Sequence, residues 1–91
     1  MPEIRAKVGS AVGLHARPAA LFAAAAAASP VPVMVCKPGG DPVDARSILS
    51  VLTLDARFGD ELILSAEGPR AAETLASLAQ VLETDHDQAQ G

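Results

Sequence analysis

The stretch GLHARPAA, residues 13–20, places a histidine, an arginine and a proline just ahead of an alanine-rich run. Proline suits the first turn of a helix and alanine is the best helix former, so a helix is predicted from Arg17 to about Ser29. The first amides of a helix have no partner within the helix and carry a partial positive charge, so they bind phosphate readily. His15 therefore stands where a ring nitrogen can carry a phosphoryl group.

Three residues of this stretch have an expected part in such a site. His15 is the expected phosphoryl acceptor, because a neutral imidazole nitrogen is a nucleophile. The backbone N–H groups of Ala16 and Arg17 would bind the phosphate, and the Arg17 guanidinium would add a charge-assisted hydrogen bond. A histidine that only caps a helix is the simpler interpretation, and this stretch by itself leaves that interpretation open.

Other site chemistries find less support in the residues. The chain has one further histidine, His86, and one cysteine, Cys36. Zinc sites need clustered Cys and His ligands, so neither a metal site nor a cofactor is predicted. No G-x-S-x-G motif points to a hydrolase. Cys36 lies in a valine-rich stretch and is expected to be a buried structural thiol.

The composition bounds the class of protein. Ninety-one residues, 49% hydrophobic and 20% charged, are typical of one globular domain. A net charge of −4 and only two aromatic residues argue against nucleic-acid binding. The alanine run is too short to span a membrane and follows a patterned strand, so neither membrane insertion nor export is expected. A single cysteine fits a reducing compartment, and the expected location is the cytoplasm.

Hydrophobic periodicity predicts the elements that must position His15. In chain order they are a strand over 3–8, a helix over 17–29, a hairpin of strands over 31–37 and 43–45, a short helix over 48–54, a strand over 61–68 and a helix after Pro69. Gly9 and Gly13, between the first two elements, are free to take positive φ. The side chains expected to face inward are Ile4, Ala6, Val8, Ala19, Phe22, Ala26, Val33, Val35, Val51, Leu54, Leu62, Leu64, Ala66, Ala71, Leu75, Leu78 and Leu82.

The alternation in the first strand decides the architecture. Arg5 and Lys7 need water, so all helices must cover the other face of the sheet. The expected fold is α+β, an open-faced two-layer sandwich in which three helices cover one face of a four-stranded antiparallel sheet, in the order βαββαβα. Residues 1–84 are expected to form this domain, and the polar tail 85–91 is expected to be disordered.

Three segments of the chain resemble one known family. GLHARPAA resembles the active-site signature of HPr, the histidine-containing phosphocarrier of the bacterial sugar phosphotransferase system. ARSILSVLTL, residues 45–54, resembles the family's regulatory-serine segment, and GDELILSAEGPRAAETLASL, residues 59–78, resembles its last strand and helix. The resemblance runs over most of residues 3–83 at the family's spacing, which makes a capping histidine a poor explanation of His15.

The resemblance implies a phosphoryl relay. Enzyme I, charged by phosphoenolpyruvate, would phosphorylate His15, and the IIA domain of a sugar permease would receive the group. The chain would be a carrier without independent catalytic activity, and it is expected to be a monomer. Val12 replaces a polar residue often found three residues before the histidine, so one polar contact to the phosphate is expected to be missing.

The resemblance also implies a docking surface on the first two helices. Ile48, Leu49 and Leu52 would form an exposed patch beside Ala20, with Arg46 steering acidic partners. Ser47 matches the family's regulatory serine, which a kinase phosphorylates in some bacteria, although a helix N-cap also explains a serine there.

Three alternatives to a sugar-system carrier stay open. One is a regulatory docking protein of the HPr type, controlled by phosphorylation of Ser47, which could dispense with His15. Another is a carrier of the parallel nitrogen-related phosphorelay, which uses the same chemistry. The last is a small-ligand-binding α+β module in which His15 is structural.

Overall fold

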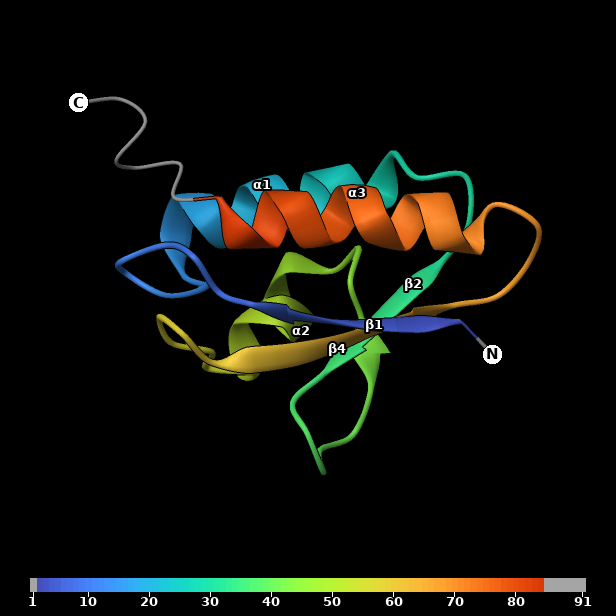
Figure 1. The fold of residues 1–91 in the computed structure, drawn as a ribbon. Coiled ribbons are helices and arrows are strands. Elements are labelled where there is room, and N and C mark those ends of the chain that lie inside the picture. Colours follow the sequence, from blue (N-terminus) through green and yellow to red (C-terminus); the bar gives the residue numbers. More distant parts are fainter. Residues whose placement is uncertain (1, 85–91) are drawn as a thin grey trace.

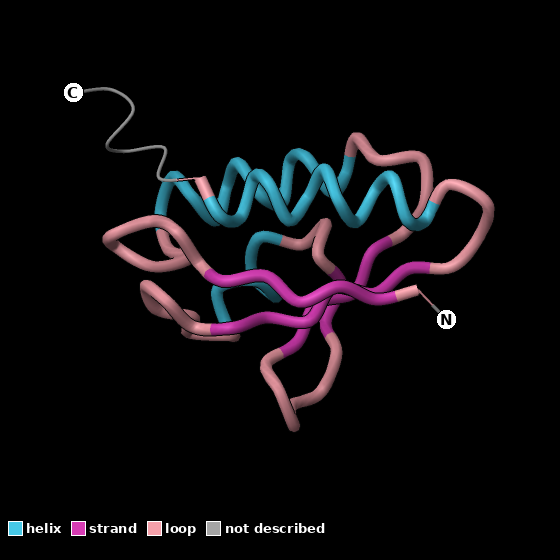
Figure 2. The backbone as a smooth tube through the Cα atoms, in the orientation of Figure 1, coloured by secondary structure: helices cyan, strands magenta, loops and turns pink. Residues whose placement is uncertain are grey.

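The computed structural model describes residues 2–84. The expected disordered tail, residues 85–91, lies outside this range. The elements are β1 (Glu3–Lys7), α1 (Ala16–Ala27), β2 (Val33–Cys36), β3 (Val43–Asp44), α2 (Ile48–Thr53), β4 (Glu61–Ala66) and α3 (Ala71–Glu83). Figure 1 shows two layers, with α1 and α3 lying side by side in opposite directions over the sheet. Figure 2 shows the connection between β2 and β3 projecting from the side of the sheet away from these helices.

All four strands pair antiparallel, in the order β1-β4-β2-β3. The helix-free face carries alternate side chains of β1, among them Arg5, whose guanidinium donates to Glu61 of β4 at 2.8 Å. The other face is covered: α3 packs on β1 and β4, α1 packs beside α3 and α2, and α2 packs beside β3. The expected open-faced α+β sandwich is therefore confirmed.

The core lies between the two layers and is made of small and medium-sized apolar side chains. Nearly all side chains expected to face inward are buried: Ala6, Val8, Ala19, Phe22, Ala26, Val33, Val35, Val51, Leu62, Leu64, Ala66, Ala71, Leu75, Leu78 and Leu82. Ile4 and Leu54 are only half-buried and pack at the edge of this core. Phe22 is the largest fully buried side chain, and the alanines around it let α1 approach its neighbours closely.

One expectation about a single residue is wrong, that of a buried Cys36. The sequence also left Gly9 free to take positive φ, but Gly9 does not do so. A Cβ at Gly9 would collide with the carbonyl of Glu83, so this glycine is needed because β1 and the end of α3 meet there. The Gly9 amide donates to the Leu82 carbonyl at 3.1 Å. Cys36 is only partly buried, because the alternation of β2 turns it toward the helix-free face.

Candidate functional site

His15 occupies the N-cap position of α1, with extended backbone angles of φ −131° and ψ 164°. Its carbonyl accepts the first bond of the helix, from the Ala19 amide at 3.5 Å. Its side chain makes no capping hydrogen bond and is 41% exposed. The His15 side chain therefore does not cap the helix, and the imidazole stands at the helix end in contact with solvent.

The first two amides of α1, from Ala16 and Arg17, have no hydrogen-bond partner within residues 2–84. Pro18 follows and has no N–H to offer. No acidic side chain lies in the first turn of the helix. The partial positive charge of the helix end is thus left unopposed within the turn, which is the arrangement that binds an anionic group.

Arg17 is exposed and forms no ion pair within the described part of the chain. The other four arginines, Arg5, Arg46, Arg57 and Arg70, each lie within 4.0 Å of a carboxylate. The guanidinium nearest to His15 in sequence is therefore the one left to bind an external anion.

The loop before His15 is fixed by a close approach to residues 55–60. Gly13 has φ +80°, and a Cβ there would lie 2.8 Å from the Ala56 carbonyl oxygen. The same carbonyl accepts a hydrogen bond from the Leu14 amide at 2.8 Å, and the Leu14 side chain is buried. These contacts fix the residues that precede His15, and α1 begins directly after it. The backbone of His15 is therefore held on both sides.

The backbone at Ala16 is held in an unfavourable conformation, with φ +49°. A non-glycine residue at positive φ costs free energy, of order 1–3 kcal/mol, and persists only where its surroundings impose it. Here the constraint comes from the fixed Leu14 on one side and the buried Pro18 on the other. The strain lies directly beside the candidate acceptor.

Asp55 is the one side chain that the sequence reasoning missed at His15. Its Oδ1 lies 3.5 Å from His15 Nε2, and its Oδ2 lies 3.7 Å from a terminal nitrogen of Arg57. The Lys37 ammonium donates to the Asp55 carbonyl at 3.2 Å. No motif joins residues so far apart in the chain, so only the tertiary structure brings this carboxylate to the ring.

Ser47 is the N-cap of α2, as expected. Its Oγ accepts a hydrogen bond from the Ser50 amide at 3.2 Å. Arg46 lies beside it, but its guanidinium donates twice to Asp44, from Nε at 3.1 Å and from a terminal nitrogen at 2.9 Å. These bonds hold the pKa of Asp44 below its ordinary value and raise that of Arg46. The positive charge expected to steer partners is therefore largely offset by its neighbour.

The residues expected to form the docking patch divide into two groups. Ala20, Ile48 and Leu49 are exposed, with Leu49 at 73%. Leu52 is half-buried and packs against the core. Since α1 packs against α2, the exposed residues lie on adjoining elements. Two further exposed apolar side chains, Val12 and Phe58, belong to the loops that meet at Gly13, and sequence reasoning did not single out Phe58.

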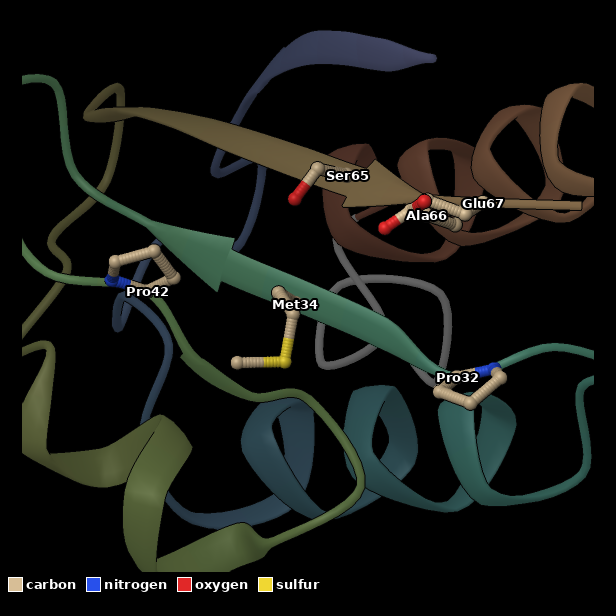
Figure 3. Close-up of a pocket in the computed structure, with 6 residues that line it drawn as sticks. All are labelled: Pro32, Met34, Pro42, Ser65, Ala66 and Glu67. Atoms are coloured by element: carbon tan, nitrogen blue, oxygen red, sulfur yellow. The ribbon is translucent and has the colours of Figure 1, made fainter. Parts of the chain in front are cut away.

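A hollow of about 420 Å³ lies elsewhere in the surface. It is lined by Pro32, Met34, Pro42, Ser65, Ala66 and Glu67, and Figure 3 shows these residues along β2, β4 and the turn before β3. Its lining holds no histidine, cysteine or cationic side chain to bind or receive an anion. His15 is not among the residues that line this hollow.

Within residues 2–84, no group of three or more His, Cys, Asp or Glu side chains is placed to hold a metal ion. No helix in that range has the length and apolar character that crossing a bilayer requires.

Comparison with known proteins identifies the same family that the motifs indicated. Residues 2–84 match the family model described as the PTS HPr component phosphorylation site. The phosphocarrier protein HPr of Streptomyces coelicolor is 46% identical over 82 residues, which is 90% of this chain and 88% of that protein. A crystal structure of HPr from Thermoanaerobacter tengcongensis superposes with a TM-score of 0.82 at 35% identity, covering 91% of this chain and 92% of that one. HPr from Bacillus anthracis also gives 0.82, at 33% identity and with 89% and 95% of the two chains covered.

Proposed function

Because the chain belongs to the HPr family of phosphocarriers of the bacterial phosphotransferase system, we propose that it accepts a phosphoryl group on His15 from phosphoenolpyruvate-charged enzyme I. The group then passes to the IIA domain of a sugar permease. In this role the chain is consumed and regenerated as a substrate and catalyses nothing by itself. The cycle belongs in the cytoplasm, where the expected donor and acceptor act.

The observation that carries this proposal is the open helix end at His15. A nucleophilic ring stands in contact with solvent beside two amides and one guanidinium that have no partner within residues 2–84. The backbone amides of Ala16 and Arg17 and the Arg17 guanidinium can each donate a hydrogen bond to a phosphoryl oxygen.

The same geometry suits a group that must be handed on. Dipole effects at a helix end are worth about 0.3–1 kcal/mol, or up to about 2 kcal/mol. Two amides and one exposed arginine therefore orient the phosphate without trapping it. The His15 side chain is 41% exposed, so a partner protein can bring its own acceptor up to the phosphorus.

Partners are proposed to dock on the exposed residues Ala20, Ile48 and Leu49, which adjoin the start of α1. Leu52 supports this patch from below, because it is half-buried between the patch and the core. The chain is proposed to act as a monomer. Its edge strand β1 carries the charged residues Glu3, Arg5 and Lys7, and its other edge strand, β3, is only two residues long.

A regulatory role of Ser47 is the second candidate, and one contact supports it. The Ser47 side chain caps α2 directly beside the exposed Ile48 and Leu49. A phosphate on this oxygen would place about two negative charges at the rim of the docking patch and would weaken docking of enzyme I. This role adds to the carrier function and does not replace it.

The experiment that tests the carrier role follows phosphate from phosphoenolpyruvate through a purified bacterial enzyme I to the wild type and to His15→Ala. The expected result is an acid-labile phosphate on the wild type and none on the variant, whose exposed side chain can be truncated without loss of the fold. Transfer onward to a sugar-specific IIA domain or to a nitrogen-related one separates the two relays. A folded wild type that binds enzyme I and stays unlabelled would contradict the proposal.

A further inference from the structure

The ring of His15 presents two different edges, and Asp55 faces one of them. Asp55 Oδ1 lies 3.5 Å from Nε2. The neighbouring ring carbon, Cδ2, lies 3.3 Å from the place that a Cβ of Gly13 would occupy. The Cδ2–Nε2 edge is therefore turned toward the two loops, and Nδ1 lies on the opposite edge. Within residues 2–84 no hydrogen bond is made to Nδ1.

Asp55 is held in this position by its neighbours. The Lys37 ammonium donates to its carbonyl at 3.2 Å, and the next residue, Ala56, accepts the Leu14 amide at 2.8 Å. Its backbone has φ +49°, a conformation that Asp tolerates better than most residues. The backbone that carries the Asp55 carboxylate is thus joined by hydrogen bonds to Lys37 and to Leu14, the residue that precedes His15.

We propose that Asp55 is a positioning residue for the phosphoryl transfer proposed above, on which this inference rests. A neutral imidazole carries one proton, on either nitrogen. The Asp55 carboxylate lies 3.5 Å from Nε2 and attracts a proton on that nitrogen, so it favours the tautomer in which the lone pair of Nδ1 is free. This is the part that a buried aspartate plays for a catalytic histidine in hydrolase triads, transferred to an exposed carrier.

The transfer step then needs no movement of the ring proton. The lone pair of Nδ1 attacks phosphorus and forms the N–P bond, while the bond between phosphorus and the donor breaks and its electron pair leaves with the donor. The proton stays on Nε2, and the ring gains a positive charge that the carboxylate offsets. In the onward step the electron pair of the N–P bond returns to Nδ1, and the ring is regenerated in its starting tautomer.

A carboxylate near the site also repels the incoming phosphoryl group, and distance decides which effect is larger. The carboxylate is 3.5 Å from Nε2, whereas the phosphorus binds on the far edge of the ring. Coulombic interaction weakens with distance and is screened at an exposed surface. Arg57, 3.7 Å from Oδ2, offsets part of the same charge. The attraction to the ring is therefore expected to outweigh the repulsion of the phosphate.

The test uses two variants of the full chain and one control. Asp55→Gly removes the carboxylate and suits the positive φ, so it is expected to fold. Asp55→Asn keeps the shape and removes the charge. Asp41→Asn is the matched control, because it makes the same charge change at an exposed residue of the turn between β2 and β3 (Figure 2).

The first measurement is the nitrogen-15 NMR spectrum of the His15 ring at pH 8, where an ordinary histidine is neutral. The wild type is expected to carry its proton on Nε2, and Asp55→Gly is expected to show a larger share of the Nδ1–H tautomer. The second is the rate of phosphorylation by phosphoramidate, a small donor that needs no docking surface. Both Asp55 variants should react about two- to five-fold more slowly, the size expected for one exposed ion pair, and Asp41→Asn should match the wild type.

Two results would overturn the inference: an unchanged tautomer in Asp55→Gly, or a faster reaction in both Asp55 variants, since the latter means that repulsion of the phosphate dominates. The carrier function fails separately. If enzyme I leaves the wild type unlabelled while the tautomer still responds to Asp55, the role in positioning the ring is supported and the relay is contradicted.

Discussion

Arg17 differs from the other arginines of the chain in having no carboxylate beside it within residues 2–84. An exposed guanidinium without a partner contributes little to stability, since there is no interaction in the free protein to lose. In the proposed function, Arg17 binds the phosphate that arrives on His15. At the scale of single residues, Arg17 therefore differs from the four arginines that pair with carboxylates of the fold.

We expect Arg17→Ala to slow phosphorylation by enzyme I about tenfold, because one charge-assisted hydrogen bond to the phosphate is lost. Urea unfolding should show that Arg17→Ala is as stable as the wild type. Arg5→Ala is the control, since it removes the same charge from the helix-free face, where Arg5 pairs with Glu61. Equal rates for Arg17→Ala and the wild type would remove Arg17 from the site.

At the scale of elements, the junction between β3 and α2 places the cap of a helix at the rim of the docking patch. Ser47→Ala should lower the free energy of unfolding by about 1 kcal/mol, because the bond to the Ser50 amide is lost. Ser47→Asp should keep this stability, since Asp is an equally good cap, and should raise the KM of enzyme I for the carrier by adding charge beside Leu49. An unchanged KM for Ser47→Asp would contradict regulation through this residue.

The same junction carries the Asp44–Arg46 pair, which predicts a dependence of stability on pH. Hydrogen bonds from Arg46 lower the pKa of Asp44 in the folded protein. Unfolded Asp44, with a pKa of about 3.9, therefore takes up its proton at higher pH than the folded residue does. The stabilisation is complete above that value and is lost as the pH falls through the lower, folded pKa.

Chemical unfolding of the wild type and of Asp44→Asn, measured from pH 7 to pH 2.5, checks this dependence. The wild type should be the more stable protein at neutral pH, and the difference should shrink below about pH 4. A difference that stays constant to pH 2.5 would show that the pair acts through shape and not through charge.

At the scale of the whole molecule, one face of the sheet is left open while the helix layer gathers the site and the docking patch at the start of α1 (Figure 1). We expect Leu49→Gln to leave stability unchanged, because Leu49 is 73% exposed, and to weaken binding of enzyme I by a measurable factor. Met34→Gln is the control, since Met34 is exposed on β2, beside the hollow of Figure 3. Equal binding by both variants in calorimetry would place the docking surface elsewhere.

The fold was largely predictable from the sequence because its signals are local. Alternation marked β1 and β4, a stripe of leucines marked α3, and Pro18 with the alanines marked α1. The position of His15 at a helix end followed from the same signals. Contacts between distant segments were not predictable in this way.

Three particular residues show where local signals end. The need for glycine at Gly9 comes from the carbonyl of Glu83, which only the packing of β1 against α3 brings close. Arg46 was expected to steer partners, but its guanidinium donates two hydrogen bonds to Asp44, and the sequence alone does not show this side-chain geometry. Asp55 reaches His15 because the Leu14 amide joins the two loops, and no spacing in the sequence encodes that bond.

The measurement that tests the central claim most directly is the identity of the phosphorylated atom. After treatment with phosphoenolpyruvate and enzyme I, phosphorus-31 and nitrogen-15 NMR of the labelled chain should place one phosphoryl group on Nδ1 of His15, with Nε2 still protonated near neutral pH. Phosphate found on Ser47 instead, or no phosphate on a folded chain that binds enzyme I, would contradict the account.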